Sequence, residues 1–179
     1  MRAPRTSPSG VERRFGDDEL IVTKTDSRGV ITYANDVFLR VSALTEAEAV
    51  GQPHNLIRHP AMPRAIFDLL WETLRGGQEI FAYVVNLAAD GAHYWVLAHV
   101  TPSVDATGRL LGYHSSRRAP APAAVAAVRR LYDDLLAAEA GHARPADALA
   151  ASRALLTERL AGQTYDEFVW SLIPAGDAA

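Results

Sequence analysis

The pattern of apolar and polar positions changes from strand-like to helical within the first third of the chain. Two segments rich in Val, Ile, Thr and Tyr, residues 20–25 and 30–34, flank the polar turn sequence DSRG. This arrangement is typical of a β-hairpin. Apolar residues then recur at helical intervals over residues 36–44, and Thr45 followed by Glu48 has the spacing of a capping box. The pattern predicts a hairpin followed by two short helices.

The clearest helical pattern lies in residues 62–77. Pro63 suits the first turn of a helix, and Gly76 with Gly77 ends the pattern. The apolar residues repeat every three or four positions, as one face of a helix requires: Ile66, Phe67, Leu70, Trp71 and Leu74.

Three further β-rich segments, residues 79–87, 93–102 and 110–118, are joined by short sequences that carry the Asp and Gly of tight turns. Strands and helices do not alternate one for one, which disfavours a doubly wound parallel sheet. The order predicts an α+β fold, in which a five-stranded antiparallel sheet carries its short helices on one face. Such a sheet encloses a core large enough to hold a ligand.

Helical patterns return after the Pro- and Ala-rich sequence at residues 119–124. One helix is predicted to end at Gly141, a second to begin near Pro145, and a third to follow a capping-box spacing at Thr164. We therefore expect a C-terminal helical extension over residues 119–179. Its helices are short of bulky residues, so we expect them to pack on the sheet or on another chain.

The rest of the chain divides into two segments, which differ in composition. Residues 1–18 are polar and carry no hydrophobic period, which predicts a disordered N-terminal arm. Residues 19–118 then form the central folded domain.

Composition narrows the classes of function. Hydrophobic residues make up 49% of the chain and charged residues 22%, as in a folded globular protein. A net charge of −3 argues against a general nucleic-acid binder. The absence of cysteine excludes disulfides and fits a reducing cytoplasm. No apolar run approaches the roughly 20 residues of a membrane span, and the first residues lack the apolar region of a secretory signal. We expect a cytoplasmic protein without direct membrane insertion.

Catalytic motifs are not visible in the sequence. It holds no Gly-rich phosphate loop, no HExxH and no G-x-S-x-G. Asp68 and Glu72 lie four residues apart, but they follow an ordinary amphipathic pattern. The sequence therefore predicts a protein that is not an enzyme.

Residues 53–63, PHNLIRHPAMP, hold three prolines beside polar side chains. Because proline removes a backbone donor, this segment is predicted to be neither a helix nor a central strand. Arg58 offers a planar fork of donors suited to phosphate oxygens, and the prolines lower the entropy cost of holding it in place. We interpret the segment as the rigid rim of a pocket.

Four stretches resemble the PAS domain of bacterial aerotaxis receptors and of their stand-alone soluble relatives. They are ITYAND at 31–36, GQPHNLIRHPAMPRAIFDLLWETL at 51–74, DGAHYWVLAHVTP at 90–102 and, more weakly, GYHSSRR at 112–118. The similarity covers about residues 19–118. The terminal YDEFVWSL is similar to the extension of single-domain members.

The resemblance implies a PAS fold that holds FAD noncovalently and signals the redox state of that cofactor. The family's binding pattern falls here on Asn35, Arg58, His59, Phe67, Asn86 and Tyr94. Trp71, on the same helical face as Phe67, is expected to line the pocket or the core around it. Asn35 also suits a helix N-cap. Asn86 in mid-strand needs hydrogen-bond partners if it is buried, and a flavin edge would supply them.

Two residues depart from the family pattern. Ala61 stands where the family has Asp, and Ile80 stands where it has Trp, which predicts a more apolar pocket. Haem, another flavin, an apolar metabolite and a packed, empty core therefore remain alternatives. Haem would need a histidine ligand, but His93 and His99 share the less apolar face of their strand. The opposite face is predicted to point inward: Tyr94, Val96, Ala98 and Val100.

These observations favour a cytoplasmic sensor and signalling module of the aerotaxis type. No output segment is recognisable, so the signal is expected to pass to a histidine kinase, a chemotaxis component or a second copy of the chain. The alternatives are a haem-based gas or redox sensor and a ligand-free PAS interaction module.

Overall fold

The computed structural model of the chain describes residues 6–173. Residues 1–5 of the predicted arm and residues 174–179 of the predicted extension lie outside the described residues.

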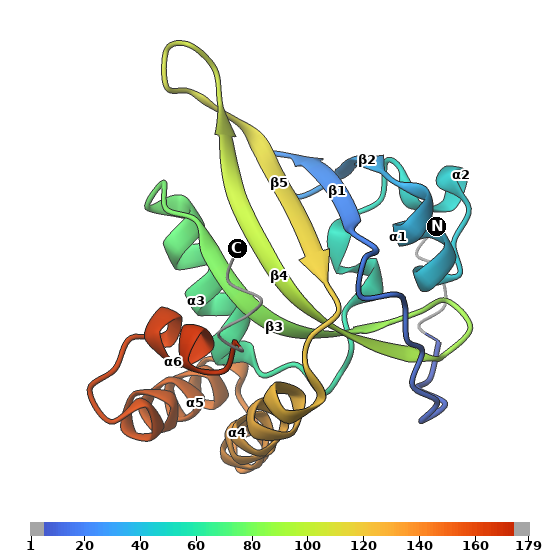
Figure 1. Ribbon diagram of the computed structural model, residues 1–179. Helices are drawn as coiled ribbons and strands as arrows, with labels where there is room; N and C mark the ends of the chain where they lie inside the picture. Colours follow the sequence, from blue (N-terminus) through green and yellow to red (C-terminus); the bar gives the residue numbers. More distant parts are fainter. Residues whose placement is uncertain (1–5, 174–179) are drawn as a thin grey trace.

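A single five-stranded sheet organises the chain, in the order β2-β1-β5-β4-β3, with every neighbouring pair antiparallel (Figure 1). The predicted α+β fold is confirmed. The strand bounds match the sequence pattern closely, and they are β1 (Ile21–Asp26), β2 (Ile31–Ala34), β3 (Ile80–Leu87), β4 (His93–Val104) and β5 (Leu110–Arg118). The last strand in the sequence, β5, lies at the centre of the sheet.

Short helices between β2 and β3 cover one face of the sheet. They are α1 (Asp36–Ser42), α2 (Glu46–Ala49), the 3₁₀ turn η1 (His54–Ile57) and α3 (Arg64–Arg75). The capping box predicted at Thr45 is present. The prediction that residues 53–63 hold no helix is wrong for η1, which forms between two prolines. Pro53 sits at its N-cap position, where a proline costs no helical hydrogen bond.

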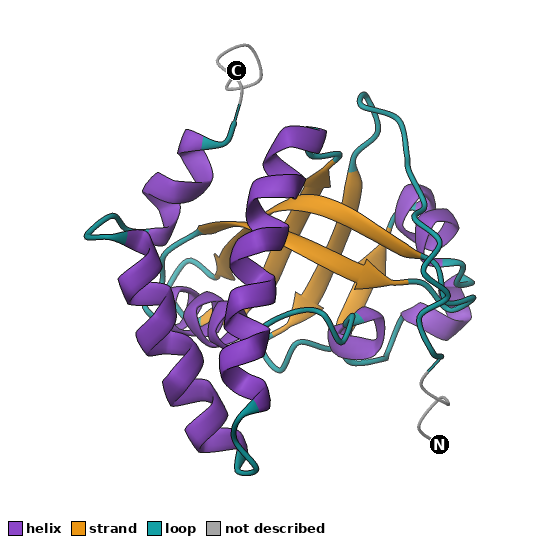
Figure 2. Cartoon of the chain, turned by 90° about the horizontal axis from the view of Figure 1, so that it is seen from below, coloured by secondary structure: helices purple, strands orange, loops and turns teal. Residues whose placement is uncertain are grey.

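The C-terminal helices pack on the opposite face of the sheet and beside α3. They are α4 (Pro122–Ala140), α5 (Pro145–Leu160) and α6 (Tyr165–Ser171). Figure 2 shows α4 crossing the sheet, and α5 packs alongside α4 and α3. Arg153 of α5 pairs with Asp68 and Glu72 of α3. The extension thus packs on the sheet of its own chain, which is one of the two arrangements expected from the sequence.

A buried tyrosine pair attaches this extension to β3. The hydroxyl of Tyr132 donates to the carbonyl oxygen of Tyr83 at 2.6 Å and is hydrogen-bonded to the hydroxyl of Tyr165 at 2.8 Å. The indole of Trp170 packs against Phe81, with ring centroids 4.8 Å apart. Both contacts are made by residues of β3 that point away from α3.

The predicted disorder of the N-terminal arm is wrong for residues 9–13. The amide of Ser9 donates to the carbonyl of Gly91 at 2.8 Å, and Val11 and Arg13 exchange backbone hydrogen bonds with His93. The guanidinium of Arg13 donates to the Val41 carbonyl at 2.8 Å. The unpaired backbone at the start of β4 supplies partners that the polar sequence does not reveal.

The described residues include no helix with the length and apolar character needed to cross a membrane.

We expect Tyr132→Phe to lower the free energy of unfolding by about 1–2 kcal/mol, because it removes one buried hydroxyl and leaves the Tyr83 carbonyl without that donor. Urea denaturation measures the change. Tyr33→Phe is the matched control, because Tyr33 is 47% exposed. Equal stability of the two variants would show that the tyrosine pair does not stabilise the docking of the extension.

Candidate ligand pocket

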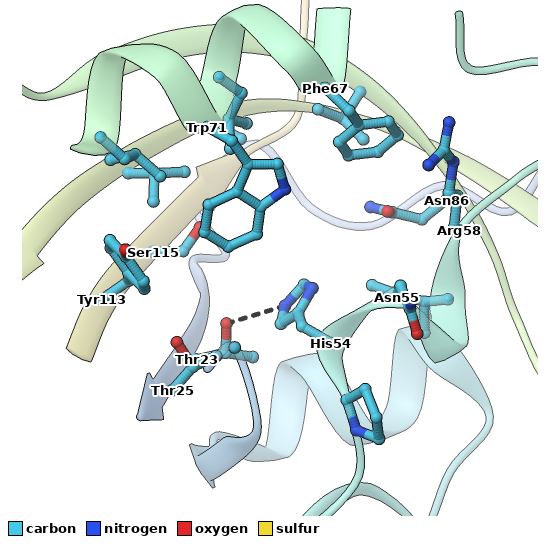
Figure 3. A pocket seen from close by; sticks show the side chains of 18 of the residues that line it. Thr23, Thr25, His54, Asn55, Arg58, Phe67, Trp71, Asn86, Tyr113 and Ser115 are labelled. Atoms are coloured by element: carbon cyan, nitrogen blue, oxygen red, sulfur yellow. Dashed lines mark hydrogen bonds between the residues drawn. The ribbon is translucent and has the colours of Figure 1, made fainter. Parts of the chain in front are cut away.

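A cavity of about 240 Å³ lies between the sheet and the helices that connect β2 with β3. Side chains of β1, β3, β4 and β5 form its floor, and η1 and α3 form its sides (Figure 3). Its mouth is open to solvent, since Trp71 at the rim is 39% exposed. This volume is slightly below the roughly 300–1,000 Å³ typical of small-molecule sites. The enclosed part therefore suits one ring system, with larger groups left at the mouth.

Aromatic side chains of α3 form one wall. Phe67 and Trp71 lie one turn apart on the helix, so both point to the same side. The indole of Trp71 meets the ring of Tyr113 from β5 edge to face, with centroids 5.4 Å apart. This wall offers flat apolar surface against which a planar ligand can pack.

The proline-rich segment joins this wall to the sheet. Arg58 forms a backbone bridge with Asn86 of β3, and its guanidinium carbon lies 4.2 Å from the centre of the Phe67 ring. Such a cation–π contact holds the arginine along the pocket wall. The rigid segment thereby places Arg58, Asn86 and Phe67 beside one another.

The side of the pocket opposite α3 is polar, and this polar wall comprises residues of η1 and of the neighbouring floor strands β1 and β5. Nη2 of Arg117 donates to Nε2 of His54 at 2.7 Å and to Oγ1 of Thr23 at 2.8 Å. Burial, and secondly the charge of Arg117, lowers the pKa of His54 to about 3. Burial lowers the pKa of Arg117 to about 10. At neutral pH, His54 is therefore neutral and Arg117 is a buried cation.

Four buried polar atoms of the pocket lining have no hydrogen-bond partner within residues 6–173: Oγ1 of Thr25, Nδ2 of Asn86, Oγ of Ser115 and Nη1 of Arg117. An unsatisfied buried polar atom costs roughly 1–3 kcal/mol, and folded proteins contain few of them. Four such atoms around one cavity indicate a place for a polar ligand edge.

Comparison with known proteins agrees with this architecture. The family described as the PAS fold matches residues 21–114, which is more than half of the chain. The chain belongs to the PAS family. Its resemblance to aerotaxis receptors is confirmed by 43% identity over 121 residues to the aerotaxis receptor of Escherichia coli, covering 68% of this chain and 24% of the receptor. This PAS protein therefore corresponds to about a quarter of that relative's length.

Two further comparisons are more distant. The nitrogen fixation regulatory protein of Klebsiella pneumoniae is 33% identical over 97 residues, which cover 54% of this chain and 20% of that protein. A light-oxygen-voltage domain studied with a flavin analogue superposes with a TM-score of 0.55 at 16% identity, over 64% of this chain and 86% of that domain. At that identity the superposition supports the fold alone.

Four of the seven residues predicted for the site line the PAS pocket: Arg58, Phe67, Trp71 and Asn86. Asn35 lies outside it as the N-cap of α1, where Oδ1 accepts from the amides of Phe38 and Val22 and Nδ2 donates to the carbonyl of Leu20. Tyr94 is fully buried and hydrogen-bonded to Ser42 at 2.6 Å, and burial raises the pKa of its hydroxyl to about 12. The geometry gives Asn35 and Tyr94 structural partners and no contact with the pocket.

His59 lies at a second cavity, between the sheet and α4, with its ring centroid 5.8 Å from that of His93. Its Nδ1 accepts from the amide of Ala61 at 3.0 Å, and burial, and secondly His93, lowers its pKa. Ala61 lines this second cavity, and Ile80 is buried without lining the first. The two departures from the family pattern therefore do not border the 240 Å³ cavity between the sheet and α3, which we call the principal pocket.

The sequence reasoning missed the polar wall. His54, Thr23, Ser115 and Arg117 were not among the candidates, although strand alternation places Tyr113, Ser115 and Arg117 on one face of β5. The same alternation correctly predicted the inward face of β4, since Ala98 and Val100 line the pocket.

His54 predicts a pH dependence of stability. Its folded pKa of about 3 lies below the unfolded value near 6.5, so the unfolded chain binds more protons between these two values. Stability is therefore lost as the pH falls through this window. Between pH 7.5 and 5.5 the loss attributable to His54 is about 1 kcal/mol.

The substitution His54→Gln removes this contribution. The free energy of unfolding of the variant, measured by urea denaturation, should therefore depend less on pH than that of the wild type. His142→Gln, at an exposed histidine, is the control and should keep the wild-type dependence. Parallel pH profiles for wild type and His54→Gln would contradict the assignment.

Proposed function

We propose that this PAS protein is a redox or oxygen sensor of the aerotaxis type, which holds FAD in the principal pocket and signals through protein contacts. The observation that carries the proposal is the set of four polar atoms without a partner among the described residues, in a pocket that also has an aromatic wall, in a chain 43% identical over 121 residues to an aerotaxis receptor.

The residues of the pocket suit the ring system of a flavin. That ring system is planar, with an apolar end and a pyrimidine edge of carbonyl oxygens and ring nitrogens. Phe67 and Trp71 would pack against its apolar surface, and Asn86, Ser115 and Arg117 would hydrogen-bond its polar edge. Arg58, at the side of the pocket, would meet the phosphate-bearing part. When bound, the flavin supplies reversible electron transfer, and this is the chemistry that a redox sensor requires.

Asn86 connects the pocket with the output side of the sheet. Its amide can offer either a donor or an acceptor by rotating, so it can respond to a changed hydrogen-bonding pattern at the ring. Tyr83, three residues earlier on β3, accepts the hydrogen bond of Tyr132 from α4. A displacement of β3 would therefore alter how the C-terminal helices are held. The ligand shifts this balance only by its different affinity for the two arrangements.

The output then passes to another polypeptide. We propose a histidine kinase, a chemotaxis component or a second copy of the chain as the partner of α4–α6. A cytoplasmic location and the absence of catalysis stay predictions from the sequence. Haem has no supporting contact here, because His54, the one histidine among the described residues that line this pocket, already accepts from Arg117.

The absorption spectrum of the freshly purified protein tests the cofactor directly. We expect flavin absorbance after extraction under native conditions, or its appearance when FAD is added to stripped protein. A colourless protein that takes up no added FAD refutes the flavin proposal.

Two substitutions test the placement of the ligand. Asn86→Ala is expected to weaken FAD binding about tenfold, and Ser115→Ala about fivefold, which are the effects of losing one or two hydrogen bonds. Titration monitored by flavin fluorescence measures both. Ser116→Ala is the matched control, because Ser116 is the next residue of β5 and faces the other side of the sheet. Equal losses for Ser115→Ala and Ser116→Ala would place the flavin elsewhere.

A further inference from the structure

Arg117 is a buried cation that has no carboxylate partner in the part of the chain that the structure describes. It lies near the end of the central strand β5, where the strand registers pair it with Ile21 of β1 and Ala98 of β4. Only 5% of its surface is exposed. None of the ion pairs between described residues includes it. Burying an unpaired charge is strongly unfavourable, so a buried arginine of this kind indicates a role other than stabilising the fold.

The groups that face Arg117 are neutral at pH 7. His54 accepts through Nε2, which requires the unprotonated ring, and its pKa is lowered to about 3. Thr23 carries no charge, and the pKa of Tyr94 is raised to about 12. The ring of Phe38, centred 5.9 Å from the guanidinium carbon, contributes a cation–π contact. These contacts orient the guanidinium without neutralising it.

The guanidinium is held at one nitrogen and left without a partner at another. Nη2 makes both hydrogen bonds, to His54 and Thr23, whereas Nη1 is buried and makes none with any described residue. Arg117 also lines the principal pocket. A charged donor that is oriented by two residues and has a vacant hydrogen-bonding position is suited to bind an anionic acceptor.

We propose that Arg117 is the charged recognition residue of the pocket, and that its Nη1 donates to a negatively charged or strongly polarised acceptor on the edge of a planar ligand. His54 and Thr23 are positioning residues, because they act on the ligand only through Arg117. The inference rests on the proposed function in taking this cavity as the ligand site. It adds that the pocket selects an acceptor-rich edge over an apolar ligand of the same size.

Recognition and stability should then oppose each other at this position. Arg117→Met keeps the length of the side chain and removes the buried charge. Oγ1 of Thr23 and Nε2 of His54 already lie within hydrogen-bonding distance in the wild type, at 3.2 Å, so this hydrogen bond can persist when Arg117 is replaced. If Arg117 is retained for binding, its removal is expected to weaken ligand affinity. The ligand-free variant is then expected to be as stable as the wild type or more stable.

The experiment compares the wild type with Arg117→Met and Arg118→Met after removal of bound ligand. Arg118 is exposed and adjacent on β5, with its side chain on the other face of the sheet, and is therefore the matched control. FAD is titrated into each protein, and calorimetry gives the melting temperature without ligand. We expect Arg117→Met to raise the Kd for FAD at least tenfold, with a melting temperature equal to or above that of the wild type.

Unchanged affinity, or an affinity loss no larger than that of Arg118→Met, overturns the proposal. A melting temperature lowered by several degrees in Arg117→Met alone, with FAD still bound at wild-type affinity, assigns Arg117 a purely structural role.

A second probe separates this inference from the flavin proposal. Benzoate, a single planar ring bearing a carboxylate, is added to the same three proteins in the absence of FAD. If the wild type takes up no FAD, the flavin proposal fails. The recognition role of Arg117 is still supported if benzoate raises the melting temperature of the wild type and Arg118→Met but not that of Arg117→Met. If benzoate affects all three proteins equally, or none, the role of Arg117 fails as well.

Discussion

The two buried faces of the sheet are the constraint on which the rest of the structure depends. Side chains of a strand alternate between faces, and nearly every residue of β3 is buried on one face or the other. Asn86 and Val84 line the pocket, whereas Phe81 contacts α6 and the backbone of Tyr83 binds α4. One strand therefore contacts both the candidate ligand site and the C-terminal helices α4 and α6. A shift of β3 cannot be confined to one side, because both faces are packed.

The pocket combines a rigid frame with an unsatisfied interior. The proline-rich segment is held to β3 by the Arg58–Asn86 bridge, and α3 supplies the aromatic wall. Among residues 6–173, polar atoms inside this frame remain without partners, and the buried cation Arg117 has no counter-charge. Preorganised sites carry such costs in the free protein, since the groups are already placed when the ligand arrives. The same features would be unfavourable in a sheet whose only role was structural.

Local patterns gave most of the fold. Alternation, helical periodicity, capping spacings and glycine stops depend on residues a few positions apart, and they predicted the strands, the long helix and the three C-terminal helices closely. Arg58, Phe67 and Asn86 were predicted through the resemblance to aerotaxis receptors, and Trp71 through its place on the same helical face as Phe67. All four line one cavity. Asn35 fitted both the family pattern and a helix N-cap, and in the structure its amide is fully used in the cap.

The sequence by itself determined the five strands, the α-helices, the α+β class and the inward face of β4, because each follows from spacing along a single segment. Only the tertiary structure decided the polar wall. His54 and Arg117 are 63 residues apart, and their hydrogen bond exists because η1 is brought against the central strand of the sheet. No local period records that encounter. The placement of the extension was likewise decided by Tyr132 reaching a backbone carbonyl of β3, and carbonyl groups are the same at every position of a sequence.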